Sequence, residues 1–119
     1  MLKKTITYTD YDGNERTEDF YFNLTQAELI ELAHSEKGGL EKLIEKISKE
    51  KDMKRIIALM KEVIQMSYGE KSLDGKRFQK SEEISQNFMQ TEAYSILFME
   101  LAQNEDAATD FVNGIVPKV

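Results

Sequence analysis

The sequence predicts a mainly α-helical protein with an N-terminal β-hairpin, an α+β fold whose five or six short helices form a small bundle. Segments 4–10 (KTITYTD) and 16–22 (RTEDFYF) flank the turn YDGNE and are rich in β-branched and aromatic residues, as hairpin strands are. From residue 25 onward, apolar residues recur at steps of three and four, the period of amphipathic helices.

A length of 119 residues suits one domain and is too short for two independent cores. No internal repeat or low-complexity tract divides the chain. We therefore expect a single domain over 1–119, in which 1–24 form the hairpin, 25–68 a first helical part, 69–80 a loop and 81–119 a second helical part.

The length of the hairpin loop sets the strand register. A two-residue loop would set Ile6 opposite Asp19, whereas a three-residue loop through Asn14 sets Ile6 opposite Phe20. We favour the longer loop, because it keeps the apolar side chains on one face, and a single buried face fixes register. That face consists of Ile6, Tyr8, Phe20 and Phe22. Since an isolated hairpin is marginally stable, the face should pack on helices.

The first helix begins at the segment LTQAEL. Thr25 and Glu28 have the spacing of a capping box, in which each side chain bonds the backbone amide of the other residue. Leu24 and Leu29 occupy the positions of a hydrophobic staple. The helix should end before the glycine pair at 38–39.

Two further helices are predicted before Gly69, which is well placed to end the third helix. The second helix has an apolar stripe of Leu40, Leu43, Ile44 and Ile47. The third helix has Asp52 as its N-cap. The residues that recur in it at three- and four-residue steps are Met53, Ile56, Ile57, Met60, Val63, Ile64 and Ser67.

The C-terminal third of the chain carries three more helix signals. Gly114 should end the last helix, and Pro117 prevents its continuation. The predicted helices are a short one through Phe88 capped by Ser81, a longer one from Glu92 to about Gln103 capped by Thr91, and a last one over 106–113.

The segment YGEKSLDGKRFQKS at 68–81 raises the question of a phosphate or calcium site. A phosphate-binding P-loop has four residues between its glycines, but here there are five, and a helix rather than a strand precedes them. A calcium loop needs oxygen ligands at positions that Lys76 and Phe78 occupy. We therefore predict a turn at 72–75, with Gly75 at a positive φ angle and Asp74 bonding nearby backbone.

Four cations in and next to this segment form a basic patch on an otherwise acidic chain. The patch could meet an acidic partner helix or could simply be solvated surface. Its members are Lys71, Lys76, Arg77 and Lys80.

Composition argues against several function classes. The chain has 22 acidic and 16 basic residues and a net charge of −6, which opposes the phosphate neutralisation that nucleic-acid binding requires. It has no cysteine and a single histidine, His34, so we expect no metal site, no cofactor and no catalytic constellation. No segment approaches the roughly 18 apolar residues of a membrane span. We expect a cytoplasmic, non-enzymatic protein.

Large apolar residues in 88–101 exceed what the earlier helices supply. Many of them are expected in the core, but methionine and aromatic side chains also line grooves that accept varied helices. The candidate partner-binding residues are Phe88, Met89, Tyr94, Phe98, Met99 and Leu101.

Four blocks resemble one family of small phage proteins. They are DFYFNLT (19–25), YGEKSxDGKRFxKS (68–81), QTEAYSxLFMELA (90–102) and FVNGIVP (111–117), and the resemblance keeps their order and covers nearly the whole chain. In this respect the chain resembles the tail assembly chaperones of tailed bacteriophages and prophages.

The resemblance implies a non-enzymatic protein of the host bacterial cytoplasm. It would bind the long, helical tape measure protein, help tail-tube subunits assemble around it, and be absent from the finished particle. The major tail protein is a second candidate partner, and apolar residues in excess of one small core favour a homo-oligomer. The alternative is a structural tail or head-tail completion protein that stays in the virion.

Overall fold

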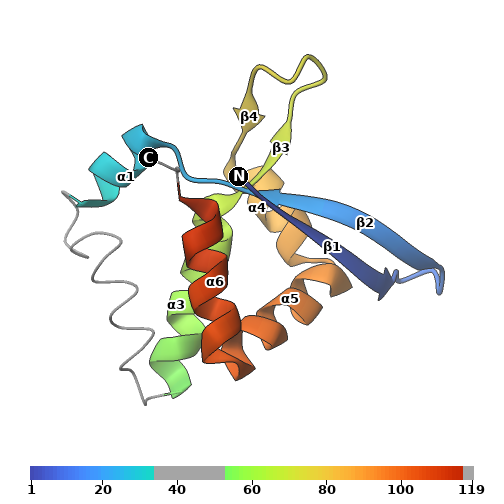
Figure 1. The fold of residues 1–119 in the computed structure, drawn as a ribbon. Coiled ribbons are helices and arrows are strands. Elements are labelled where there is room, and N and C mark those ends of the chain that lie inside the picture. Colours follow the sequence, from blue (N-terminus) through green and yellow to red (C-terminus); the bar gives the residue numbers. More distant parts are fainter. Residues whose placement is uncertain (34–52, 117–119) are drawn as a thin grey trace.

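The computed structural model describes residues 1–33 and 53–116, and it confirms the predicted α+β fold (Figure 1). In this part of the chain, four strands form one antiparallel sheet in the order β1-β2-β3-β4. In the sequence, helices precede β3 and follow β4. The elements are β1 (Leu2–Thr9), β2 (Glu15–Phe22), α1 (Gln26–Ala33), α3 (Met53–Ser67), β3 (Tyr68–Lys71), β4 (Phe78–Gln79), α4 (Glu82–Met89), α5 (Glu92–Gln103) and α6 (Glu105–Ile115).

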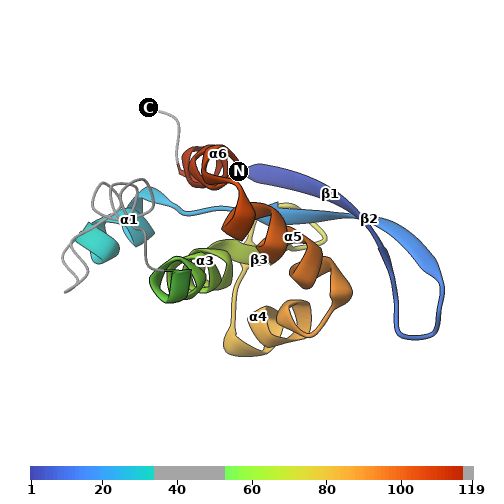
Figure 2. The same cartoon turned by 90° about the horizontal axis from the view of Figure 1, so that it is seen from below.

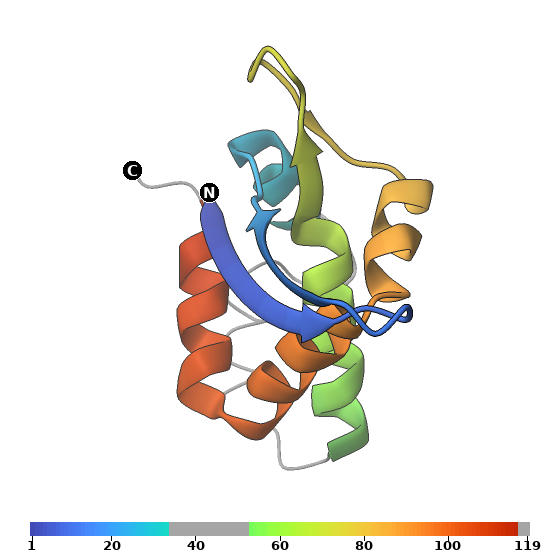
Figure 3. The ribbon, with the colours of Figure 1, turned by 90° about the vertical axis from the view of Figure 1, so that its right-hand side faces the viewer.

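Helices α3, α5 and α6 lie behind the β1–β2 hairpin in Figure 3, so that they cover one face of it. The tip of this hairpin projects beyond the helices (Figure 2), and the β3–β4 hairpin projects in a different direction. The second predicted helix, His34, the N-cap Asp52 and Pro117 lie outside the described residues.

The predicted β1–β2 register is wrong by two residues. Ile6 lies opposite Glu18 rather than Phe20. The backbone amide of Asp10 donates to the carbonyl oxygen of Asn14 at 2.9 Å, so the three-residue loop consists of 11–13. A shift of two residues keeps every side chain on its predicted face, since the side-chain period of a strand is two.

Gly13 explains the register. A three-residue hairpin loop needs a residue at positive φ in its last position. Gly13 takes that position with φ 86° at no steric cost, whereas the predicted loop would have placed Asn14 there. The Asp10 carboxylate also accepts hydrogen bonds from the backbone amides of Asp12 and Asn14, at 3.0 and 2.9 Å.

The N-caps predicted for α1, α4 and α5 are confirmed. The Thr25 hydroxyl accepts from the Glu28 amide at 3.1 Å, and the Glu28 carboxylate accepts from the Thr25 amide at 2.8 Å, which completes the capping box of α1. The hydroxyls of Ser81 and Thr91 accept from the third residue beyond them and start α4 and α5. These helix starts are therefore local properties of the sequence.

Helix α6 differs from its prediction at both ends. Asn104 caps it, and it continues through Gly114 to Ile115. The glycine packs where the N-terminal strand comes close, because a Cβ atom there would lie 3.0 Å from a methyl group of Leu2. Close approach, rather than helix termination, accounts for the glycine.

The segment 69–80 is not simply the loop that was predicted, because it contains β4 and all but the first residue of β3, and these two strands form a second hairpin. The predicted turn at its tip is confirmed. Gly75 has φ 74° and its amide donates to the Ser72 carbonyl oxygen at 2.9 Å, and the Asp74 carboxylate accepts from the Lys76 amide at 3.0 Å.

An aromatic cluster joins the sheet to α4 and α5. Phe88 lies at its centre: its ring stacks on Tyr68 with centroids 4.2 Å apart and contacts Phe20 and Phe22 at 5.1 and 5.8 Å. The buried hydrophobic residues are Ile6, Phe20, Phe22, Leu24, Met60, Val63, Ile64, Phe88, Ala93, Leu97, Leu101, Ala108, Phe111, Val112 and Ile115.

Candidate partner-binding surfaces

The structure divides the six predicted partner-binding residues between core and surface. Phe88 and Leu101 are only 3% and 2% exposed, so neither side chain is available to a partner in this conformation. Met99 is 46% exposed. The remaining three, Met89, Tyr94 and Phe98, are half-buried.

Helix α5 shows why the predicted stripe is split. Ala93, Leu97 and Leu101 repeat every four residues and form its buried side. Met99 and Ile96, one turn apart, lie away from that side and are 46% and 43% exposed. The sequence prediction missed Ile96, and its spacing from Met99 was the signal that could have found it.

Tyr94 and Phe98 border the buried side of α5 on its other flank. Their ring centroids are 5.8 Å apart, and Tyr94 also meets Phe88 edge-on at 5.8 Å. Burial raises the pKa of the Tyr94 phenol above its usual value. Helix α5 therefore has apolar side chains next to its buried side in both directions around the helix, Tyr94 and Phe98 on one flank and Ile96 and Met99 on the other. We call these four residues the α5 surface.

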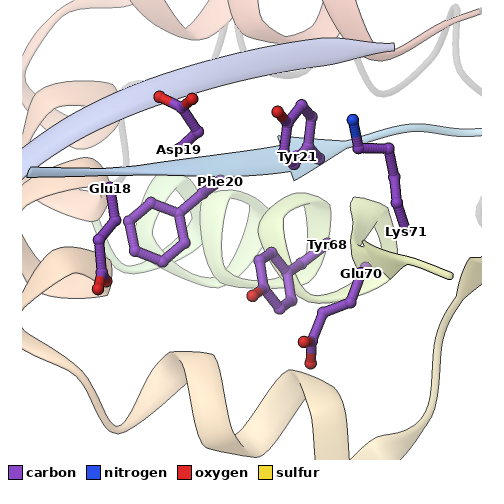
Figure 4. A pocket seen from close by; sticks show the side chains of 8 residues that line it. Glu18, Asp19, Phe20, Tyr21, Tyr68, Glu70 and Lys71 are labelled. Carbon is purple, nitrogen blue, oxygen red and sulfur yellow. The ribbon is translucent and has the colours of Figure 1, made fainter. Parts of the chain in front are cut away.

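A second candidate site is a cleft of about 410 Å³ where β2 and β3 diverge. It is lined by two four-residue segments, 18–21 of β2 and 68–71 of β3. Figure 4 shows that the side chains of Asp19, Tyr21 and Lys71 lie on one side of β2, and those of Glu18, Phe20, Tyr68 and Glu70 on the other. We call the second group the inner side of the cleft and the first its outer side.

The inner side combines aromatic rings with carboxylates. Burial raises the pKa of the Tyr68 phenol to about 12, and the nearby charges of Glu70 and Glu18 add to the effect. The Glu18 carboxylate accepts a hydrogen bond from the Tyr8 hydroxyl, and it lies 3.5 Å from the Arg16 guanidinium. On the outer side, the Lys71 ammonium group lies 4.2 Å from the centre of the Tyr21 ring.

The predicted basic patch is not one free surface. The Lys80 ammonium group donates to the carbonyl oxygens of Asn23 and Met66 and to the Glu28 carboxylate. Lys71 is exposed but lies over the Tyr21 ring on the outer side of the cleft, and Lys76 and Arg77 are exposed at the tip of the β3–β4 hairpin.

Within residues 1–33 and 53–116, no three His, Cys, Asp or Glu side chains come together in a way that could hold a metal ion. None of the helices described there has the length and apolar character needed to cross a membrane. The one histidine of the sequence, His34, lies outside this part of the chain.

Comparison with known proteins agrees with the resemblance of the four sequence blocks. A family model for the phage tail assembly chaperone matches residues 1–119, the full length of the sequence. Searches of curated proteins and of solved structures found no match. Because the match spans the whole chain, the protein belongs to the phage tail assembly chaperone family.

Proposed function

We propose that this chaperone binds the tape measure protein and assists assembly of the tail tube around it, without catalysing a reaction. The site of action is the cytoplasm of the host bacterium. Membership of the family supports a role in tail assembly, and the partner is the step that we add.

The exposure of Met99 and Ile96 on α5 is the observation that carries the proposal. Both are 43% exposed or more, although the opposite side of the same helix is packed in the core. Methionine adapts to varied apolar shapes, and grooves that hold amphipathic helices commonly use it. A long helical client exposes apolar stripes until the tube surrounds it, so a surface of this kind can cover such a stripe.

The remaining members of the α5 surface fit the same role. The half-buried rings of Tyr94 and Phe98 contact each other, and Tyr94 also contacts Phe88. Rigid aromatic side chains that are partly exposed lose little conformational entropy on binding. We therefore retain Tyr94, Phe98 and Met99 as contacts, keep the half-buried Met89 of α4 as a further candidate, and assign Phe88 and Leu101 a supporting role in the core.

Coexpression with the tape measure protein of the same phage tests the proposal. We expect the chaperone to raise the soluble fraction of the tape measure protein and to elute with it in size exclusion. Met99→Asp should abolish the complex, while Ile57→Asp, an equally exposed apolar position on α3, should leave it intact. Circular dichroism of both variants confirms that they are folded. A tape measure protein that stays insoluble, with no complex recovered, would exclude the proposed partner.

Mass spectrometry of purified phage particles separates this role from that of a virion component. A chaperone should be absent from the finished particle or present far below the copy number of the tube protein. Its stoichiometric presence would instead support a structural tail or head-tail completion protein.

A further inference from the structure

Strand β2 has an unpaired edge at the mouth of the cleft. Its ladder with β3 contains only the pairs Tyr21–Gly69 and Phe22–Tyr68. Further toward the hairpin tip, among the described strands, β2 is paired with β1 alone. The edge beside Asp19 is therefore open on the side where β3 turns away.

The register shows which backbone groups lie on this edge. The hydrogen-bonded pair of Asp10 and Asn14 closes the hairpin, so even-numbered positions of β2 bond to β1 and odd-numbered positions direct their amide and carbonyl groups away from it. The amide of Asn23 confirms the alternation, because it donates to Ser67 at 2.8 Å on the far side. Thr17 and Asp19 are also odd-numbered, so their amide and carbonyl groups point away from β1, and neither residue is paired with β3.

Lys71 faces the same cleft from β3. The amide of Ser72 donates to the Arg77 carbonyl oxygen at 2.8 Å, so the even positions of β3 bond to β4 and the odd ones turn toward β2. Lys71 nevertheless takes no part in the β2–β3 ladder. Unpaired strand edges are the usual template for the addition of a further strand from a partner.

The inner side of the cleft sets the chemistry of that partner. A strand added along β2 directs every second side chain toward Phe20 and Tyr68. Two carboxylates, Glu18 and Glu70, line the cleft on the same side as these rings (Figure 4), and the described residues show no ion pair of Glu70. Aromatic faces and carboxylates together favour a cation.

We propose that the β2 edge at this cleft binds an extended segment of a partner protein by strand addition, with one Lys or Arg side chain of the segment seated beside Tyr68 and Glu70. The net charge of −6 on the chain also favours a positively charged partner. The inference rests on the proposed function only in that a tail protein supplies the segment, and it uses a surface separate from that of α5.

Amide chemical shifts of isotope-labelled protein, titrated with short peptides, test the inference. The probe is a peptide of alternating valine and threonine with one central lysine, and its matched control has glutamate in place of the lysine. We expect the lysine peptide to bind at least about tenfold more tightly than the glutamate peptide, because like charges in contact are unfavourable. Its binding should shift the amides of Asp19 and Lys71 and slow their exchange with solvent.

A pair of proline variants tests strand addition itself. Asp19→Pro removes the outward amide of β2, and Thr5→Pro removes the outward amide of β1 on the opposite edge. Each substitution also removes the 2.6 Å hydrogen bond between the side chains of Thr5 and Asp19, so the two variants do not differ in this respect. We expect Asp19→Pro to abolish peptide binding and Thr5→Pro to retain it.

Charge variants provide a test that does not depend on proline. Glu70→Gln should weaken binding of the lysine peptide about tenfold, whereas Glu83→Gln on α4 should leave it unchanged. The inference is overturned if no peptide binds, if the lysine and glutamate peptides bind equally, or if both proline variants bind as the native protein does. The inference is also overturned if the free protein forms an oligomer that excludes the peptide and Asp19→Pro dissociates that oligomer. A second copy of the chain, not a partner segment, would then occupy the β2 edge.

The tape measure complex separates this inference from the proposed function. A complex that forms equally well with Asp19→Pro and Thr5→Pro contradicts use of the cleft and leaves the proposed function standing. Peptide binding in the absence of any tape measure complex contradicts the proposed function and supports the cleft as a binding site.

Discussion

The ammonium group of Lys80 lies 2.7 Å from the carboxylate of Glu28, across a sequence separation of 52 residues. The same ammonium group donates to the carbonyl oxygens of Asn23 at 2.6 Å and Met66 at 3.0 Å. One lysine therefore ties together the end of β2, the first turn of α1 and the last turn of α3. The capping box of α1 takes part in this contact through Glu28.

Replacement of Lys80 should measure the strength of that connection. We expect Lys80→Met to lower the free energy of unfolding by about 1–3 kcal/mol, because it leaves two carbonyl oxygens and a carboxylate without their charged donor. Lys76→Met, at the exposed hairpin tip, should change it by less than about 0.5 kcal/mol. Urea unfolding of both variants gives the comparison, and equal effects would show that Lys80 acts as an ordinary surface residue.

Glu28 should make stability depend on acid pH. Burial by itself raises the pKa of Glu28, but hydrogen bonds from Lys80 and Thr25 outweigh burial and hold the pKa below its usual value of 4.5. A carboxyl with a lower pKa in the folded chain stabilises the fold when ionised. Its contribution is complete above about pH 4.5 and is lost as the pH falls through the folded-state pKa.

Urea unfolding at a series of acid pH values tests this expectation. The native protein should lose more stability than Glu28→Gln as the pH falls below 4.5. The difference between the two proteins isolates Glu28, because other carboxyls with lowered pKa values, such as Asp10 and Asp74, are present in both. Parallel pH profiles would mean that Glu28 has the same pKa in the folded and unfolded chain.

Tyr68 provides a spectroscopic test of the inner side of the cleft. Its pKa of about 12 results first from burial and then from the charge of Glu70. We expect Glu70→Gln to lower the pKa of Tyr68 while leaving it above the usual 10.0, because the ring stays buried against Phe88. Asp19→Asn, on the outer side, should have no effect. An alkaline titration of the Tyr68 ring signals by NMR would show whether Glu70 and Tyr68 share this environment.

Gly69 should be essential at the point where the two hairpins meet. A Cβ atom there would lie 2.7 Å from a ring carbon of Phe78 and 2.8 Å from the backbone oxygen of Gln79. Since a backbone atom cannot move aside cheaply, Gly69→Ala should cost about 1–3 kcal/mol of stability.

Gly114→Ala is the matched control for that substitution. Its Cβ atom would meet only the side chain of Leu2, whose nearest methyl group lies at 3.0 Å, and such a side chain can shift. Alanine also favours the helix over glycine by about 1 kcal/mol, which offsets the contact. Thermal unfolding should therefore separate the two variants clearly, and similar melting temperatures would contradict the close packing at Gly69.

Local sequence signals predicted the starts of α1, α4 and α5 and the faces of the first hairpin. The capping residues Thr25, Ser81 and Thr91 act on amides only three residues away, so the sequence alone contains the relevant partners. The register of the hairpin depended on a small local difference, the lower cost of positive φ at Gly13 than at Asn14. A pattern of apolar faces cannot detect that difference, because a two-residue shift preserves the faces.

Features that depend on distant contacts escaped prediction. The short strands β3 and β4 lie in a polar segment with little strand character, and β3 exists through pairing with β2 some 48 residues earlier, as in the pair Tyr21–Gly69. From the sequence, Lys80 was predicted to belong to a surface basic patch. In the fold its ammonium group instead donates to the carbonyl oxygens of Asn23 and Met66.

The predicted partner-binding residues differ in exposure, and their role in binding stays a prediction. Helical periodicity groups Phe88 with Tyr94 and Phe98, but it does not show which of them the sheet will cover. The fold places Phe88 at the centre of the aromatic cluster and leaves Met99 exposed. Whether α5 contacts the tape measure protein remains a prediction.

Hydrogen exchange of the chaperone, free and in complex with the tape measure protein, tests the central claim most directly. After isolation of the complex by size exclusion, we expect slower exchange in α5 and at 17–21 of β2, with little change in the buried helix α6. No recoverable complex, or a complex whose protection lies only outside these two segments, would contradict the account.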